Sequence, residues 1–274
     1  MERSQRKREG LEAIIHDGVS RREFAKKTML GSLVAVGGLS LMQADELAAQ
    51  SLSDIDILNF ALNLEYLEAE FYAVAATGRR IEELGLDVGG RGRRGTTVGG
   101  AVVALDEKTR IVAQNITNDE LQHVKLLRAV LRSDAVAKPD INLEALGIGF
   151  RNQTEFITLA RAFEDTGVSA YGGAAPLIDN TTILAAAAQI ALTEAQHAGM
   201  LRYIAYDKNV QTAAVDEKDI ATLGSPNGKL FYVDGNGLSI TRTAAQVLSV
   251  VYGGPGKTGG AFFPNGVNGA IARS

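Results

Sequence analysis

The strongest constraint on the fold is a set of acidic residues in the middle of four apolar helical seams. In the segments at about 54–77, 107–132, 153–171 and 182–206, apolar residues recur at alternating three- and four-residue steps. This spacing predicts four amphipathic helices and therefore an all-α fold. The centre of each seam is polar instead. The polar residues there are Glu65, Glu120, His123, Glu164, Glu194 and His197.

Four carboxylates in one apolar core need compensating positive charge, because an isolated charge is costly in a medium of low dielectric. Two of them belong to Glu-x-x-His pairs, Glu120 with His123 and Glu194 with His197. Residues three apart lie on the same side of a helix, so each pair points into the bundle. Imidazole combined with carboxylate suits Fe, Mn or Zn. The sequence therefore predicts two divalent metal ions, Fe or Mn, with Zn as an alternative.

Each of these features also has an ordinary explanation. A single Glu-x-x-His pair is common on a solvated helix face, and a lone core histidine is usually hydrogen-bonded. Glu65 resembles a surface acid, as its neighbours Glu68 and Glu70 are expected to be. The combination favours a metal site, because the chain has only 3 histidines and both of those beyond residue 49 fall in such pairs. The absence of cysteine excludes thiolate ligands.

The polar positions also form an internal repeat. Tyr72 follows Glu65 by seven residues, and Tyr171 follows Glu164 by seven. Each Glu-x6-Tyr segment is followed along the chain by a Glu-x-x-His segment. Two interpretations of the tyrosines remain open: they lie beside the metals and act in the chemistry, or they are core aromatics with one satisfied hydroxyl.

With these residues, the chain resembles the ferritin-like superfamily over about 54–207, and within it the bacterial and plant desiccation-related proteins. The stretch at 57–72, ILNFALNLEYLEAEFY, and the tail at 262–269, FFPNGVNG, carry the second resemblance. The resemblance implies a four-helix bundle with a carboxylate-bridged dinuclear site. It implies terminal ligands at Glu65 and Glu164, bridging ligands at Glu120 and Glu194, one imidazole per metal at His123 and His197, and tyrosines near the site at Tyr72 and Tyr171.

Three functions are compatible with such a site. The first is a redox enzyme or oxidant scavenger whose substrate is O2 or hydrogen peroxide, acting in oxidative or desiccation stress. The second is a non-catalytic envelope stress protein in which the metals only stabilise the bundle. The third is metal storage or carriage. The resemblance also allows a homo-oligomer, whereas the net charge of -4 argues against a nucleic-acid partner.

The first 49 residues are expected to be an export signal rather than part of the fold. The stretch at 20–26, SRREFAK, resembles the twin-arginine pattern and implies that the twin-arginine export machinery is a partner. An apolar run at 28–42 follows and is too short for an ordinary membrane span. A periplasmic or secreted protein is expected. The residues before the alanines at 48 and 49 make a poor cleavage site, so an uncleaved membrane anchor is the alternative.

The rest of the chain divides into a bundle at 50–207 and a C-terminal appendage at 208–274. A long insertion at 78–106 separates the first two helices, and its basic cluster, Arg91, Arg93 and Arg94, is expected in a flexible, solvated loop. A crossover at 133–152 leads to the third helix. The appendage is expected to contain a short strand at 230–233, a plain turn at 234–237 and a capped helix at 243–252. Its aromatic residues at 262–263 are expected to pack on the bundle.

Overall fold

The computed structural model describes residues 52–223 and 229–274. The predicted export signal at 1–49 lies outside these residues. The described chain forms four long helices, a short fifth helix, two 3₁₀ turns and one two-stranded sheet. The long helices are α4 (Asp54–Thr77), α5 (Glu107–Leu131), α6 (Gln153–Ala174) and α7 (Thr181–Asp207). Among the described residues, no helix combines the length and the apolar character that a membrane span requires.

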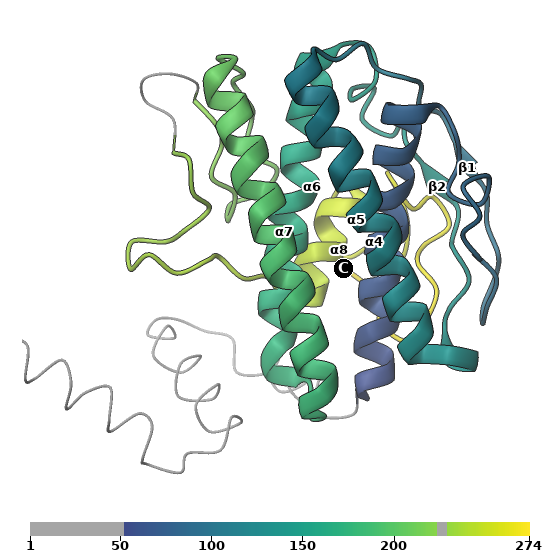
Figure 1. The fold of residues 1–274 in the computed structure, drawn as a ribbon. Helices are drawn as coiled ribbons and strands as arrows, with labels where there is room; N and C mark the ends of the chain where they lie inside the picture. Colours follow the sequence, from purple (N-terminus) through teal and green to yellow (C-terminus); the bar gives the residue numbers. More distant parts are fainter. Residues whose placement is uncertain (1–51, 224–228) are drawn as a thin grey trace, which may run out of the picture. The chain divides into compact units, whose positions relative to one another are not determined.

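The four long helices pack side by side as one bundle (Figure 1). The closest pairings are α4 with α5 and α6 with α7, and fewer contacts join one pair to the other. The observed bundle confirms the predicted all-α fold. Its chain order also follows the internal repeat, since each helical pair contains one Glu-x6-Tyr helix and one Glu-x-x-His helix.

Side chains at the helix starts explain why the four helices begin where they do. Ser53 and Asp56 form a reciprocal capping box at α4, and Asp106, Asn152 and Asn180 cap the other three helices. The helix α4 ends at Gly78, whose φ of 73° is the left-handed conformation that glycine tolerates best. The predicted boundaries agree with these to within a few residues. The largest difference is α6, which extends to Ala174 instead of residue 171.

The insertion at 78–106 is tied to the crossover at 133–152, so the expectation of a flexible loop is wrong. Strand β1 (Thr97–Val98) pairs in parallel with β2 (Ile141–Asn142), beside α4 in Figure 1. Lys138 is fully buried beneath this pair and donates to the carboxylate of Glu70 on α4 and to the hydroxyl of Thr97. The buried ion pair holds the crossover to α4, and Thr97 of the insertion hydrogen-bonds both of its members. Hydropathy patterns do not reveal such contacts.

The basic cluster of the insertion is exposed, as expected, but it is partly neutralised. Arg91 forms an ion pair with Asp134, with 2.7 Å between Nη1 and Oδ1. Arg93 pairs with Asp140. Both acidic partners belong to the crossover, so these arginines add surface contacts between the same two connections that the sheet joins.

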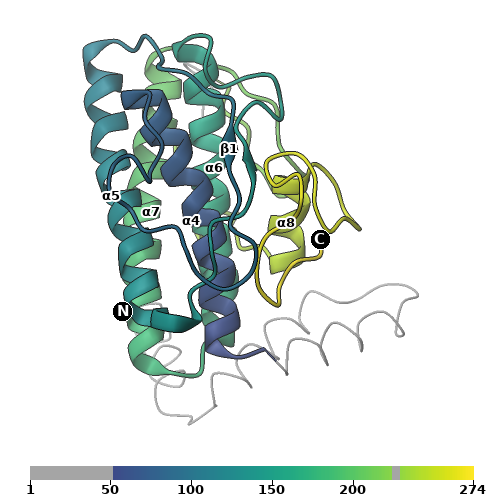
Figure 2. The same cartoon turned by 90° about the vertical axis from the view of Figure 1, so that its right-hand side faces the viewer.

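The C-terminal segment packs on the bundle through α8 (Ala244–Tyr252), which contacts α6 (Figure 2). Phe262 is buried against Phe163 of α6, with ring centroids 5.0 Å apart. Arg242 donates to the hydroxyl of Ser169. The predicted strand at 230–233 is wrong, because only Val233 pairs, in an isolated bridge to Ser239. The turn between them is a plain hydrogen-bonded turn, as expected.

Candidate metal centre

The structure brings all six polar seam residues together in the core of the bundle. Each long helix contributes from its middle: α4 one residue, α5 two, α6 one and α7 two. The carboxylates are at most 1% exposed and the two imidazoles are 7% exposed. The residues of the cluster are Glu65, Glu120, His123, Glu164, Glu194 and His197.

The six residues form two overlapping groups. In the first group, Nδ1 of His123 lies 3.2 Å from Glu65 Oε2, 3.4 Å from Glu120 Oε2 and 3.1 Å from Glu194 Oε1. In the second group, Nδ1 of His197 lies 3.2 Å from Glu120 Oε1 and 3.3 Å from Glu164 Oε2, and Glu194 completes the group. Glu120 and Glu194 belong to both groups, whereas Glu65 and Glu164 belong to one each.

These separations are those of atoms around a common ion. Two ligand atoms about 2.1 Å from one ion lie about 3.0 Å apart at a right angle and about 3.4 Å apart at the tetrahedral angle. The nitrogen–oxygen distances of 3.1–3.4 Å fall within this range. A single imidazole N–H, in contrast, can be well aligned with only one of several surrounding oxygens. The geometry therefore suits a bound cation better than a hydrogen-bond network.

The hydrogen-bond inventory of the cluster leads to the same conclusion. Buried ligand-type atoms without a hydrogen-bond partner are concentrated here, although buried polar groups are almost always satisfied. Even with both imidazoles protonated, the four carboxylates leave two negative charges uncompensated. With neutral imidazoles, two divalent cations would balance the charges of all four carboxylates. The unpartnered atoms are Glu65 Oε2, both oxygens of Glu120, Glu164 and Glu194, and Nδ1 of His123 and His197.

The same crowding changes the proton affinity of the cluster. Burial, together with the charge of Glu65, raises the pKa of Glu120 to about 7. Burial alone would lower the pKa of His197, but the carboxylates of Glu120 and Glu164 outweigh it and raise that pKa to about 12. His123 shifts in the same direction, also because of surrounding carboxylates. In the absence of metal, protons therefore take over part of the charge compensation.

A family model of the ferritin-like domain matches residues 53–207, more than half of the chain and the whole of the bundle. The chain belongs to the ferritin-like domain family. The match confirms the predicted resemblance to the ferritin-like superfamily. The matched range covers all four helices that contribute residues to the two groups.

Two curated relatives place the ferritin-like chain more closely. It is 23% identical over 271 residues to the ferritin-like catalase Nec2 of Nesocodon mauritianus, covering 81% of this chain and 85% of that protein. It is 24% identical over 173 residues to the desiccation-related protein PCC13-62 of Craterostigma plantagineum, covering 57% of this chain and 54% of that protein. The second relative carries the desiccation-related name that the resemblance anticipated.

A residue outside the predicted ferritin-like site orients one of its imidazoles. Asp119 Oδ2 lies 3.2 Å from His197 Nε2, on the side of the ring away from the carboxylates. A carboxylate that accepts the Nε2 proton fixes the tautomer in which Nδ1 presents its lone pair to the core. The sequence analysis missed Asp119, although its position directly before Glu120 in the Glu-x-x-His pair was an available signal.

The two tyrosines of the ferritin-like core differ in their hydrogen bonds. Both are buried, at 8% exposed for Tyr171 and 0% for Tyr72. The Tyr171 hydroxyl donates to Glu65 Oε1 at 2.5 Å, so this tyrosine of α6 orients a carboxylate of α4. Among the described residues, the Tyr72 hydroxyl has no hydrogen-bond partner. Burial and the nearby charge of Glu164 raise the pKa of Tyr72 well above its ordinary value.

Glu68 and Glu70 are buried, so the expectation that they are surface acids is wrong. Glu70 is 0% exposed and forms the ion pair with Lys138 described above. Glu68 is 5% exposed. Burial, and then the charges of the four cluster carboxylates, raise the pKa of Glu68 well above its ordinary value. The seam pattern did not reveal these positions because α4 is buried around most of its circumference.

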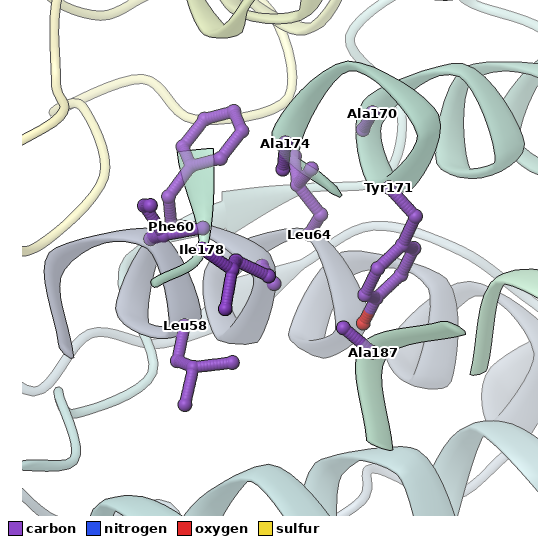
Figure 3. A pocket seen from close by; sticks show the side chains of 10 residues that line it. Leu58, Phe60, Leu64, Ala170, Tyr171, Ala174, Ile178 and Ala187 are labelled. Carbon is purple, nitrogen blue, oxygen red and sulfur yellow. The ribbon is translucent and has the colours of Figure 1, made fainter. Parts of the chain in front are cut away.

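A small apolar pocket lies next to the ferritin-like centre, between the first half of α4, the end of α6 and α7 (Figure 3). Leu58, Leu64, Ala174 and Ala187 are among its lining residues, and Tyr171 borders it. Tyr171 contacts both regions, because it lines the pocket and its hydroxyl donates to Glu65. An apolar cavity of this kind suits a small uncharged molecule.

Proposed function

We propose that this ferritin-like protein holds two metal ions, Fe or Mn, in the core of its bundle and reacts with hydrogen peroxide or O2. The observation that carries the proposal is the pair of residue groups that share Glu120 and Glu194. Their buried atoms lack hydrogen-bond partners, and their spacing matches ligands around an ion. Two cations that share two carboxylates are held close enough to act on one small substrate.

In this proposal, Glu65 and His123 would hold one metal, Glu164 and His197 would hold the other, and Glu120 and Glu194 would serve both. The metals would supply the redox capacity that no side chain in the core provides. The chain fixes their ligands: Tyr171 orients Glu65 by a hydrogen bond, and Asp119 orients the imidazole of His197. The unpartnered hydroxyl of Tyr72 is available to hydrogen-bond a substrate oxygen inside the core.

Hydrogen peroxide is the favoured substrate, because one relative is named a ferritin-like catalase. The reaction would convert two molecules of hydrogen peroxide to two of water and one of O2, which balances atoms and electrons without another reductant. The apolar pocket beside Tyr171 would suit O2 both as the product of this reaction and as the substrate of an oxidase, so it does not distinguish the two.

The test is to load the purified, metal-free protein with two equivalents of Fe(II) or Mn(II) and to mix it with hydrogen peroxide in a stopped-flow instrument. We expect peroxide to disappear, and O2 to be released, faster than with the same ions in buffer. Stoichiometric binding without faster turnover would leave only storage or a structural role. Failure to bind either metal would overturn the dinuclear site itself.

We also propose that the protein is exported through the twin-arginine pathway to the periplasm or beyond, where it acts in oxidative or desiccation stress. The support is the SRREFAK stretch and the desiccation-related relative. Changing Arg21→Lys with Arg22→Lys keeps the positive charge but removes both guanidinium groups. We expect the precursor to stay in the cytoplasm. Normal export of this variant, measured by fractionation, would show that an ordinary secretion signal is at work.

A further inference from the structure

The exposed face of helix α7 carries no acidic or basic side chain between residues 181 and 206. Every acidic or basic residue in this range is buried: Glu194, His197 and Arg202. The counterpart helix α5 also has one side in the core, yet it exposes charged residues such as Lys108 and Lys125. The needs of the core therefore do not explain why the outside of α7 is uncharged.

The exposed face of α7 contains a second apolar seam besides the one in the core. Small or apolar residues recur there at steps of three or four, which is the spacing of a helix that packs against another helix. In the internal repeat, α5 has Asn118 where α7 has Leu192, and Lys125 where α7 has Gly199. The members of this outer seam are Ala185, Ala188, Leu192, Ala195, Gly199 and Tyr203.

The outer seam lies beside a part of α5 that is also apolar. The helices α5 and α7 lie next to each other on one side of the bundle, and α8 lies on the other side (Figures 1 and 2). Leu126 and Val130 of α5 are exposed. They follow Asp119, which contacts His197 on α7, by 7 and 11 residues, so they lie on the side of α5 towards α7.

This two-helix face has the size of a stable interface. A helix of 27 residues such as α7 is about 40 Å long. Two such helices with axes about 8–10 Å apart present a face of roughly 800 Å². Each partner in a protein interface of standard size contributes about the same area. The face is therefore large enough to hold two proteins together without further contacts.

The distribution of side-chain size along α7 fits a second copy of the same chain. The first half of the exposed face has the small residues Ala185 and Ala188, and the second half has Met200, 46% exposed, and Tyr203, 54% exposed. In an antiparallel pair of α7 helices centred on residue 194, position 188 lies opposite 200, and 185 lies opposite 203. The large side chains of each copy then lie against alanines of the other. Two-fold symmetric interfaces require such self-complementarity.

Charge favours the same partner. The chain has a net charge of -4, so two copies repel each other when charged surfaces approach. Contact through the outer seam places no carboxylate against another and desolvates no ion. A partner recognised by its charge would instead require charged groups on this face. The uncharged face of a second copy meets the condition.

We propose that the protein forms a two-fold symmetric dimer in which the outer seams of two copies pack antiparallel. The outer seam contains none of the six candidate metal ligands. Each copy would therefore keep a complete metal centre of its own. Dimer formation and metal binding are separate properties, and each can be lost without the other.

Analytical ultracentrifugation of the full chain tests the dimer. We expect wild type to sediment with twice the mass of one chain. Leu192→Glu places a charge in the middle of the outer seam and should raise the dissociation constant at least about thirtyfold, as the loss of a central contact does. The matched control is Leu238→Glu, since the two leucines are 66% and 65% exposed and Leu238 lies outside the helices. The control should sediment like wild type.

Engineered cysteines test the antiparallel register, because the chain has none of its own. The double variant Ala188→Cys with Met200→Cys should form a disulfide-linked dimer on mild oxidation, since each position 188 faces position 200 of the other copy. Ala188→Cys alone should not, because the two copies of residue 188 would lie about 18 Å apart along the helices. Efficient linkage of the single variant would indicate a parallel pair and overturn the proposed arrangement.

Two results would overturn the dimer itself. One is a wild type that sediments as a single chain at every concentration measured. The other is a dimer that survives both Leu192→Glu and a second variant in the outer seam, Ala195→Glu, with circular dichroism confirming that both variants are folded. Binding of Fe(II) or Mn(II) should be the same in wild type and in the variants. Failure of the metal centre would therefore leave the dimer intact, and failure of the dimer would leave the metal centre intact.

Discussion

The two halves of the bundle, α4 with α5 and α6 with α7, repeat the same chemistry with different surroundings. Glu65 and Glu164 are counterparts, and so are the two Glu-x-x-His pairs. Even the arginines after these pairs correspond. Arg128 donates to the hydroxyl of Tyr66, the residue that follows Glu65, at 2.6 Å. Arg202 binds Asp165, the residue that follows Glu164, with Nη2 to Oδ2 at 2.6 Å.

The differences between the halves lie in the residues around this shared frame. The position of Glu68 on α4 is taken by Gly167 on α6. Asp119 contacts His197, and the residue at the matching position on α7 is Thr193. The Thr193 hydroxyl instead donates to the backbone carbonyl of Gln189 on the same helix. The positions of the six candidate ligands thus follow the internal repeat, whereas the residues that surround these ligands do not. Two metals in this frame would therefore have the same number of ligand residues but different surroundings.

The largest expected effect comes from removing what the halves share. Glu120→Ala with Glu194→Ala takes two ligands from each metal group and should abolish stoichiometric binding of Fe(II) or Mn(II). The variant should remain helical by circular dichroism. Its metal-free form should unfold at a higher temperature, because the repulsion between buried carboxylates is relieved.

The matched control removes two ligands from one half only. Glu65→Ala with His123→Ala should lose one ion and keep the other, because the second group retains all its members. Equal metal content in the two double variants would contradict the assignment of shared and unshared ligands.

Tyr171 and Tyr72 give a second comparison, because among the described residues only the Tyr171 hydroxyl has a hydrogen-bond partner. Tyr171→Phe leaves Glu65 Oε1 without its donor and should destabilise the metal-free protein by about 1–3 kcal/mol. Tyr72→Phe removes an unpartnered hydroxyl and should leave stability unchanged or slightly higher. Thermal or urea unfolding measures both. If the two variants lose stability equally, the hydrogen-bond difference between the halves is wrong.

The pH dependence tests the charge of the cluster. In the metal-free fold, the pKa of Glu120 is raised from 4.5 to about 7 and that of His197 from 6.5 to about 12. The folded chain then binds more protons than the unfolded chain, so stability should fall as the pH rises above about 5. Metal binding displaces these protons, so metal affinity should rise over the same range.

Unfolding midpoints at pH 5, 7 and 9, with and without Mn(II), measure both trends. The stabilisation by metal should grow from the lowest to the highest pH. A metal-free protein that becomes more stable between pH 5 and 8 would show that the cluster does not hold extra protons.

The sequence was sufficient for the features that follow helical periodicity. The seams predicted the four helices, and the position of each polar residue in its seam predicted that all six would meet. The contacts that depend on the other faces of α4 were not predictable in this way. Glu68 and Glu70 look like surface acids because nothing in the local pattern indicates that Lys138 and α6 cover them.

The insertion shows the same limit. Its glycines and arginines are typical of a solvated loop, yet Gly95 lies so close to the crossover that a Cβ there would be 2.1 Å from the backbone nitrogen of Asp140. The pairing of β1 with β2 joins residues more than forty positions apart. Such contacts depend on the assembled bundle, and short-range patterns do not encode them.

The smallest expected effect concerns the groups that orient the imidazoles. Asp119→Ala removes the acceptor beside His197 Nε2 and should lower the binding affinity for one of the two metals by about tenfold. The effect is expected at the lower end of the range for such residues because the Asp119 side chain is 49% exposed, so water can replace it. Thr193→Ala, at the matching position on α7, should change the binding affinity for neither metal. The Thr193 hydroxyl donates to a backbone carbonyl of its own helix. Competition with a chelator resolves the two affinities. If Asp119→Ala leaves both metals unchanged, the imidazole of His197 does not depend on this contact. The difference between Asp119 and Thr193 would then have no effect on metal binding.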